Sequence, residues 1–221
     1  MINTVLFDMD GLLIDSEPLW GEAMKEVFAS MNIHLTPSHY THTTGLRTSE
    51  VVKYWQHYFK WEGKSIREVE NEILERVEQK ILLRGEPMEG IRYILNFFKE
   101  RDFKIGLASS SPMNLIRAVL NFLDIRSYFQ AVYSAEHEEY GKPHPAVYLA
   151  CARELNSTPM ECIAFEDSVT GLIAAKAARM KTIVVPEADK RNDPRYVLAD
   201  LQLNSLLEFD EEKLRKLIEL S

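Results

Sequence analysis

Two aspartates separated by one residue, Asp8 and Asp10, are the residues near the start of the chain best suited to chemistry. They directly follow a short apolar run, Val5 to Phe7, which is typical of a strand buried on both faces. Gly11 comes next, where the chain can turn sharply. Two carboxylates so close repel each other unless a cation or a shared proton lies between them. The pair therefore predicts metal-assisted chemistry on an anion, at the carboxyl end of a strand.

Short aspartate motifs of this kind also occur in plain turns and in calcium-binding loops. An EF-hand loop would need further oxygen ligands after the glycine and a glutamate at its end. Leu12, Leu13 and Ile14 follow Gly11 instead, which excludes an EF-hand. A plain turn remains the alternative to a site when the motif is taken alone.

The composition is ordinary for a globular protein: 46% of the 221 residues are apolar and 27% are charged. A net charge of -8 disfavours a nucleic-acid partner, which would require a basic face. Two cysteines without a pattern, Cys151 and Cys162, argue against a disulfide scaffold or a zinc site. No run approaches transmembrane length, and no signal-peptide pattern opens the chain. We expect a monomeric, cytoplasmic protein with no nucleic-acid or membrane partner.

Residues 16–84 show helical patterns and no strand pattern. Helices are predicted from Ser16 to about Met31, from Thr48 to Phe59 and from Ser65 to Leu83. The polar segment 35–47, which contains proline and glycine, predicts a loop between the first two helices. We expect 16–84 to form a helical cap domain, inserted into a core made of residues 1–15 and 85–221.

This loop region also contains three histidines, His34, His39 and His42. Their spacing matches no helical ligand pair, and no cysteine or glutamate lies near them, so a metal site is disfavoured. Donors to sugar hydroxyls or to phosphate are the favoured interpretation. Arg47 is the best anion anchor of the segment, since a guanidinium can bind a phosphate through two N–H groups.

Beyond residue 85, apolar runs of strand length alternate with helical patterns. Strands are predicted at 104–108, 131–135, 162–165 and 181–185, with helices between them. Strands that alternate with helices form a parallel sheet with right-handed crossovers. The fold class predicted is therefore α/β, with a Rossmann-like parallel sheet core.

Polar residues follow several of the predicted strands or the loops beside them. They are Asp8 and Asp10, Ser109 and Ser110, Lys142, and Glu166 and Asp167. Each has a simpler explanation as a helix cap, a surface lysine or a turn. Because the carboxyl ends of parallel strands meet at one edge of the sheet, we expect these groups to converge there.

Four phrases of the sequence, FDMDGLLIDSEPLW, GLASSSP, KPHPAVYL and EDSVTGLIAAKAARM, resemble the four motifs of the haloacid dehalogenase-like phosphotransferases. The helical insertion is similar to the small cap domain of that family. Within it, the chain resembles the β-phosphoglucomutase-like branch, and there the bacterial hexitol phosphatases and 2-deoxyglucose-6-phosphate phosphatases. One departure is Gly141, which stands where relatives often have serine.

The resemblance implies a phosphatase that uses Mg²⁺ and an aspartyl-phosphate intermediate. Its substrates would be small phosphorylated metabolites, such as 2-deoxyglucose 6-phosphate or hexitol phosphates. Asp8 would be the nucleophile and Asp10 the general acid and base. Asp8, the backbone carbonyl of Asp10 and Asp167 would bind the metal, with Glu166 acting directly or through water.

The resemblance also implies roles for residues around the phosphate. Lys142, Ser109 and Ser110 would bind it, and Arg47 would meet it when the cap closes. Trp20 stands where the β-phosphoglucomutases have a cap histidine, and would either line the leaving-group pocket or pack inside the cap. Three alternatives remain: a sugar-phosphate mutase, an inorganic pyrophosphatase and a catalytically silent phosphate-binding protein.

Overall fold

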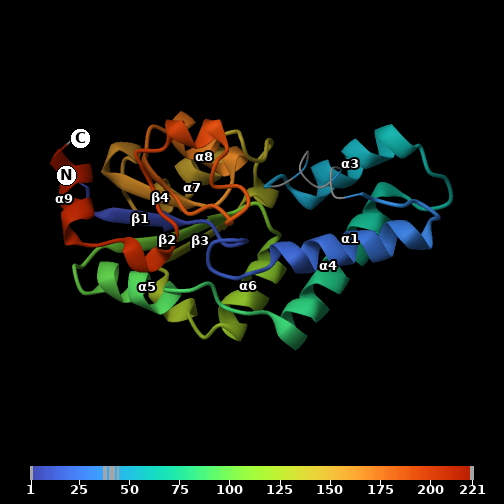
Figure 1. The fold of residues 1–221 in the computed structure, drawn as a ribbon, viewed down its shortest axis with the longest axis horizontal. Helices are drawn as coiled ribbons and strands as arrows, with labels where there is room; N and C mark the ends of the chain where they lie inside the picture. Colours follow the sequence, from blue (N-terminus) through green and yellow to red (C-terminus); the bar gives the residue numbers. More distant parts are fainter. Residues whose placement is uncertain (1, 37–38, 40–42, 44, 220–221) are drawn as a thin grey trace.

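The computed structural model describes residues 2–36, 39, 43 and 45–219. The sheet and its flanking helices form one end of an elongated molecule, and the helices α1, α3 and α4 form the other (Figure 1). Both chain termini lie at the sheet end, far from α1 and α3. None of the described helices is long and apolar enough to cross a membrane.

Six parallel strands form the core sheet, in the order β3-β2-β1-β4-β5-β6. They are β1 (Thr4–Phe7), β2 (Lys104–Ser109), β3 (Ala131–Ser134), β4 (Cys162–Glu166), β5 (Lys181–Val184) and β6 (Leu201–Gln202). Phe7 at the end of β1 pairs with Leu107 of β2 and Phe165 of β4. The next residue, Asp8, therefore emerges between the ends of two neighbouring strands. The predicted α/β class is confirmed.

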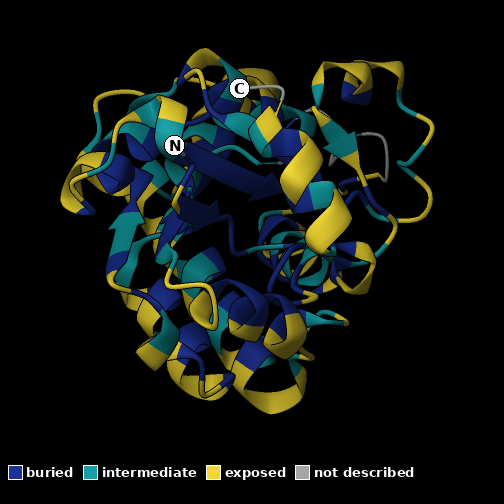
Figure 2. Ribbon diagram, turned by 90° about the vertical axis from the view of Figure 1, so that its left-hand side faces the viewer, coloured by how far each residue is buried: buried dark blue, intermediate teal, exposed yellow. Residues whose placement is uncertain are grey.

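Helices cover both faces of the sheet. They are α5 (Ile91–Lys99), α6 (Met113–Phe122), α7 (Ala146–Glu154), α8 (Val169–Ala177) and α9 (Glu211–Glu219). Alternate residues of β1 enter separate hydrophobic clusters: Val5 and Phe7 pack in the cluster that includes α5 and α6, and Leu6 in the one that includes α7 and α8. This burial on both faces explains the continuous apolar run in β1, which Figure 2 shows as a fully buried strand.

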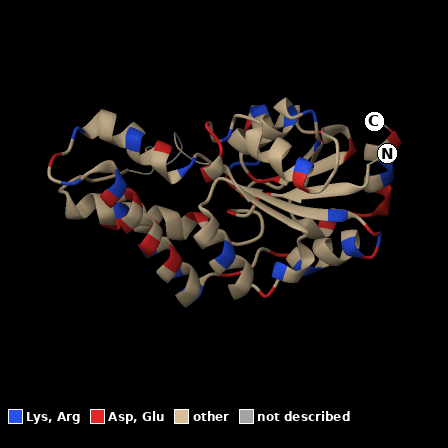
Figure 3. Cartoon of the chain, turned by 180° about the vertical axis from the view of Figure 1, so that it is seen from behind, with Lys and Arg blue, Asp and Glu red and all other residues tan. Residues whose placement is uncertain are grey.

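The inserted region contains α1 (Glu17–Ser30), α3 (Thr48–Phe59) and α4 (Ile66–Arg84), with α4 packed against both others. Buried residues of α4, Val69, Ile73, Val77 and Ile81, recur at helical spacing and form its inner face. The outer faces of the cap helices carry interspersed acidic and basic residues (Figure 3). On this surface Lys80 forms ion pairs with Glu22 and Glu26.

Two segments connect the cap to the core, and they lie side by side. Ile14 and Pro87 form an antiparallel bridge, the Asp15 amide donates to the Glu86 carbonyl at 2.9 Å, and the Met88 amide donates to the Leu13 carbonyl at 3.1 Å. We call these segments, residues 13–15 and 86–88, the hinge ribbon. The cap boundaries at residues 16 and 84 stay a prediction, and they fall just outside this ribbon.

Candidate active site

Asp8 lies at the carboxyl end of the central strand, and its side chain is held by a lysine from a distant loop. The Lys142 ammonium is 2.7 Å from Asp8 Oδ1 and 2.7 Å from Glu166 Oε1. All three residues are buried. Lys142 comes from the loop between β3 and α7, so three separate strand–helix connections supply this cluster.

Burial strongly affects the ionisation of this cluster. It raises the pKa of Asp8 to about 8, although the Lys142 charge opposes the shift. Burial likewise raises the pKa of Asp167 well above its ordinary value, and the Glu166 and Asp8 charges add to the effect. For Lys142, burial alone would lower the pKa, but the charges of Asp8 and Glu166 raise it overall. The site therefore contains more negative charge than its lysine neutralises.

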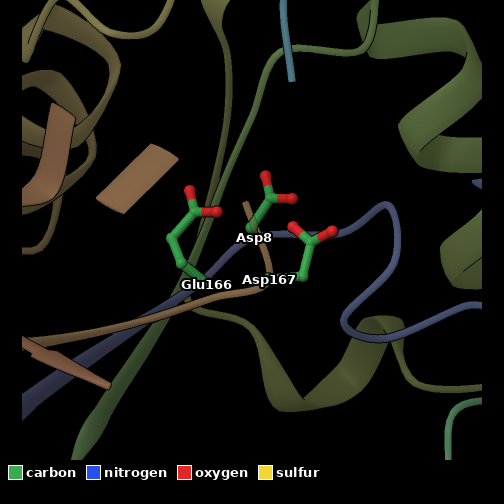
Figure 4. A group of neighbouring side chains, drawn as sticks. All are labelled: Asp8, Glu166 and Asp167. Carbon is green, nitrogen blue, oxygen red and sulfur yellow. The ribbon is translucent and has the colours of Figure 1, made fainter. Parts of the chain in front are cut away.

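Carboxylate oxygens of Asp8, Glu166 and Asp167 all lie within 4.8 Å of one another (Figure 4). Among the described residues, the Asp167 carboxylate has no hydrogen-bond or ion-pair partner, although Asp167 is only 5% exposed. A buried carboxylate without a partner is unfavourable, and oxygen ligands of this kind suit Mg²⁺. The residues present therefore fit a divalent cation.

Glu166 and Asp10 are less suited to direct metal binding through their side chains. Glu166 already accepts hydrogen bonds from Lys142, from the Tyr148 hydroxyl and from Ser168 Oγ. The Asp10 carboxylate is not part of the group of three carboxylates described above. A role for Asp10 in metal binding through its backbone carbonyl remains a prediction.

Three donors hold the Asp10 carboxylate. Ser16 Oγ and Trp20 Nε1 donate to Oδ1 at 2.7 and 2.9 Å, and Ser111 Oγ donates to Oδ2 at 2.7 Å. Ser16 occupies the N-cap position of α1, yet its hydroxyl makes no capping bond there. The Ser16 hydroxyl therefore binds Asp10 and does not cap the helix.

Gly11 explains why a glycine follows the two aspartates. Its φ is +73°, a conformation that side chains rarely adopt, and a Cβ there would lie 2.3 Å from Asp167 Oδ2. The glycine thus lets the turn after β1 pass directly beside the unpartnered Asp167 carboxylate. The turn at Gly11 therefore forms part of the wall of the proposed metal site.

Ser109 and Ser110, predicted to bind phosphate, lie at the end of β2 beside Asp8. Ser109 Oγ accepts from the Ser111 amide at 3.0 Å, and Ser110 Oγ donates to the Gly45 carbonyl of the cap at 2.9 Å. Ser110 thereby joins core to cap. Ser111, which binds Asp10, was not identified from the sequence, although the run of three serines was a signal for it.

Two buried tyrosines that contact the site, Tyr148 and Tyr196, were also not predicted from the sequence. The Tyr148 hydroxyl bonds Glu166 and lies 3.3 Å from the Lys142 ammonium. The Tyr196 hydroxyl donates to the Asp167 backbone carbonyl at 2.7 Å. Both orient acidic residues of the site. Tyr148 lies within the phrase that contains Lys142, but no local pattern connects Tyr196 to Asp167.

A cavity of about 450 Å³ opens above Asp8, between core and cap. Its core wall includes Asp8, Ser109, Ser110 and Lys142, and its cap wall includes Trp20, Leu46 and Val51. Further charged residues line the cavity that the sequence did not single out: Glu17, Glu187, Asp189 and Lys190. Trp20 both lines the cavity and packs against the hydrophobic core cluster, so its two expected roles remain predictions.

Arg47, expected to meet the substrate's phosphate, is not among the described residues that line the cavity. Its guanidinium donates to Glu50 and to backbone carbonyls of the core. The geometry therefore does not support the expected phosphate contact, because these acceptors already hold the guanidinium.

Of the three histidines in this region, the structure describes His34 and His39. The His39 ring packs edge-on against Trp55 and Tyr58, and its Nδ1 accepts from the Thr36 amide at 2.8 Å. His34 belongs to no metal-binding group among the described residues, and His42 lies outside the described residues. An aromatic packing role accounts for His39.

The model of one protein family, described as haloacid dehalogenase-like hydrolase, matches residues 5–185. The chain belongs to the haloacid dehalogenase-like hydrolase family. The match runs from β1 to the end of β5 and so contains the whole acidic cluster.

Two known phosphatases are similar over most of the chain. Hexitol phosphatase B of Escherichia coli (strain K12) is 44% identical over 214 residues, 96% of each chain. The phosphorylated carbohydrates phosphatase of Thermotoga maritima is 31% identical over 188 residues, 82% of this chain and 84% of the relative.

Solved structures show the same fold. CbbY from Rhodobacter sphaeroides in complex with phosphate has a TM-score of 0.85 at 25% identity, covering 94% of this chain and 96% of that one. A β-phosphoglucomutase from Clostridium difficile has a TM-score of 0.86 at 23% identity, covering 100% and 98%. At 23% identity, the similarity to the β-phosphoglucomutase shows a shared fold only.

Proposed function

We propose that this hydrolase is a Mg²⁺-dependent phosphatase of small sugar or sugar-alcohol monophosphates. The observation that carries the proposal is the buried Asp8, 2.7 Å from the Lys142 ammonium, at the base of a cavity enclosed by core and cap. The names of the similar proteins, hexitol phosphatase and phosphorylated carbohydrates phosphatase, support the substrate class.

In this proposal Asp8 attacks the phosphorus of the substrate and forms an aspartyl-phosphate, while the bond between phosphorus and the sugar oxygen breaks. Asp10 gives a proton to the departing sugar oxygen. Asp10 then takes a proton from water as the water attacks phosphorus, which breaks the bond to Asp8 and releases phosphate. Ser16, Trp20 and Ser111 keep the Asp10 carboxylate directed toward the cap side of the cavity.

The phosphate group needs positive charge and N–H or O–H donors around it. Lys142 supplies an ammonium, and Ser109 and the Ser110 amide are placed to bind its non-bridging oxygens. Asp8, Asp167 and the Asp10 carbonyl would hold Mg²⁺, with Glu166 contributing through water. When bound, the ion would neutralise charge that develops on the phosphate oxygens.

The remainder of the cavity would hold the sugar or polyol. Its volume of about 450 Å³ lies within the usual range for small-molecule sites. The carboxylates of Glu17 and Asp189 line it and can accept hydrogen bonds from hydroxyl groups. The Trp20 indole forms part of the cap wall and leaves its N–H on Asp10.

A panel of phosphate esters tests the proposal by measuring phosphate release with Mg²⁺ present. The panel contains hexitol phosphates, 2-deoxyglucose 6-phosphate, pyrophosphate and p-nitrophenyl phosphate. We expect the highest kcat/KM on hexitol or hexose monophosphates. Release from pyrophosphate alone would replace the proposal with a pyrophosphatase, and release from no ester would favour a silent binding protein.

A further inference from the structure

Arg47 joins the cap to the core through one guanidinium group. It is the residue before α3, and its side chain is 15% exposed. Nη1 donates to the carbonyls of Ala135 and Glu138 at 3.2 and 2.8 Å, and Nη2 donates to the carbonyl of Glu139 at 3.2 Å. All three acceptors belong to the core segment 135–141, which follows β3 and leads directly to Lys142.

Glu50, in the first turn of α3, completes the contact. Its Oε1 accepts from Arg47 Nη2 at 2.6 Å and from the Gly141 amide at 3.4 Å. Burial alone would raise the pKa of Glu50, but the hydrogen bonds and charge of Arg47, together with the Arg47 and Gly141 amides, lower it overall. The carboxylate therefore both fixes the guanidinium and contacts the core itself.

Gly141 provides the space for this approach. A Cβ at this position would lie 2.7 Å from Arg47 Nε and 2.7 Å from Glu50 Oε2. Among the described residues, Arg47 Nε is buried and has no hydrogen-bond partner, which shows how closely the Gly141 backbone packs against this side chain. The φ of Gly141 is not in the left-handed region, so the need for glycine here comes from the cap contact and not from the backbone.

We propose that Arg47 and Glu50 are positioning residues that dock the cap onto segment 135–141, and that Gly141 is the residue that admits them. Docking closes the cavity over the substrate. Arg47 then acts on the closed state of the cap and leaves the phosphate to Lys142 and the serines. The kinetic test rests on the proposed phosphatase function, whereas the scattering test below does not.

The kinetic test compares Arg47→Ala, Glu50→Gln, Gly141→Ala and the double variant Arg47→Ala/Gly141→Ala. We expect each single variant to lose about 10- to 100-fold in kcat/KM on a hexitol phosphate, since closure orients this substrate. Turnover of p-nitrophenyl phosphate should change by less than about 3-fold, because so small an ester needs little of the cap. The double variant should resemble Arg47→Ala alone, since both changes remove the same contact.

The matched control is Arg76→Ala. Arg76 pairs with Glu26 at 3.0 Å between two cap helices, so the control removes an arginine–glutamate pair without touching the core. Its kinetics should equal those of the unchanged protein. Additive losses in the double variant, together with a normal Glu50→Gln enzyme, would show that Arg47 binds phosphate instead, and would overturn the proposal.

Small-angle X-ray scattering supplies a readout independent of turnover. With Mg²⁺ and inorganic phosphate present, Arg47→Ala and Gly141→Ala should each show a larger radius of gyration than the unchanged protein and Arg76→Ala. Equal radii in all four proteins would refute the docking role even if hydrolysis is confirmed. If no ester is hydrolysed, the scattering comparison still decides the docking role.

Discussion

Replacing Glu17 by glutamine should stabilise the protein at neutral and alkaline pH. Glu17 lies in the first turn of α1 and lines the cavity. Burial raises its pKa from 4.5 to about 7; Lys190 opposes this shift, and the charges of Asp10, Glu187 and Asp15 add to it. The folded chain therefore keeps a proton on Glu17 that the unfolded chain loses at lower pH.

The sign and size of the effect follow from linkage. Between pH 4.5 and about 7 the folded state binds more protons at Glu17, so stability falls as pH rises through this window and is constant above it. A pKa difference of about 2.5 at about 1.4 kcal/mol for each pH unit gives roughly 3 kcal/mol at most. Glutamine stays neutral at every pH, so Glu17→Gln removes this dependence.

The assay is urea unfolding of both proteins at pH 5, 6, 7 and 8 in the presence of a chelator. Glu17→Gln should exceed the unchanged protein by less than about 1 kcal/mol at pH 5 and by up to about 3 kcal/mol at pH 8. Glu22→Gln is the control, because hydrogen bonds from Arg84 and Lys80 lower the pKa of Glu22, so its loss should act in the opposite direction. A stability difference that does not vary with pH would refute the reasoning.

Three further predictions concern the reaction. Asp8→Asn should lower turnover by several powers of ten, and rapid quenching should trap no phosphate on this variant. Asp15→Asn, which changes an exposed side chain, should keep both the turnover and the trapped phosphate of the unchanged protein. A chelator should abolish turnover, and Ca²⁺ should inhibit because its coordination is looser than that of Mg²⁺; full activity without metal would contradict the role of Asp167. Since Trp20 offers Asp10 only an N–H donor, β-glucose 1-phosphate and glucose 6-phosphate should interconvert far more slowly than phosphate is released; faster interconversion would indicate a mutase.

Most of the fold was predictable because its signals are local. The run ending at Phe7 had to be a buried strand, and the convergence of Asp8, Ser109 and Asp167 followed from the parallel sheet. Beyond residue 185 no element was predicted. β6 has two residues, too few for any periodicity, although the helical spacing of Leu214 and Leu217 was a sufficient signal for α9.

The site was less predictable where it depends on contacts between distant segments. Arg47 bonds carbonyls 88 to 92 residues away, and backbone carbonyls have no signature in a sequence. From the sequence, an arginine at the end of a polar loop suggested an anion-binding role instead. Tyr196 is similar, because the carbonyl it binds belongs to Asp167, 29 residues earlier.

The hinge ribbon limits how the cap can move relative to the core. The segments 13–15 and 86–88 are hydrogen-bonded to each other. The cap therefore cannot rotate about one of the two segments while the other keeps its position. Its easiest motion is a single bend across the ribbon. Ser16 and Trp20 lie just beyond the ribbon and Asp10 just before it. Each bend would therefore change how Asp10 is held, so that opening the cap would also disturb the residue that we propose as the proton donor.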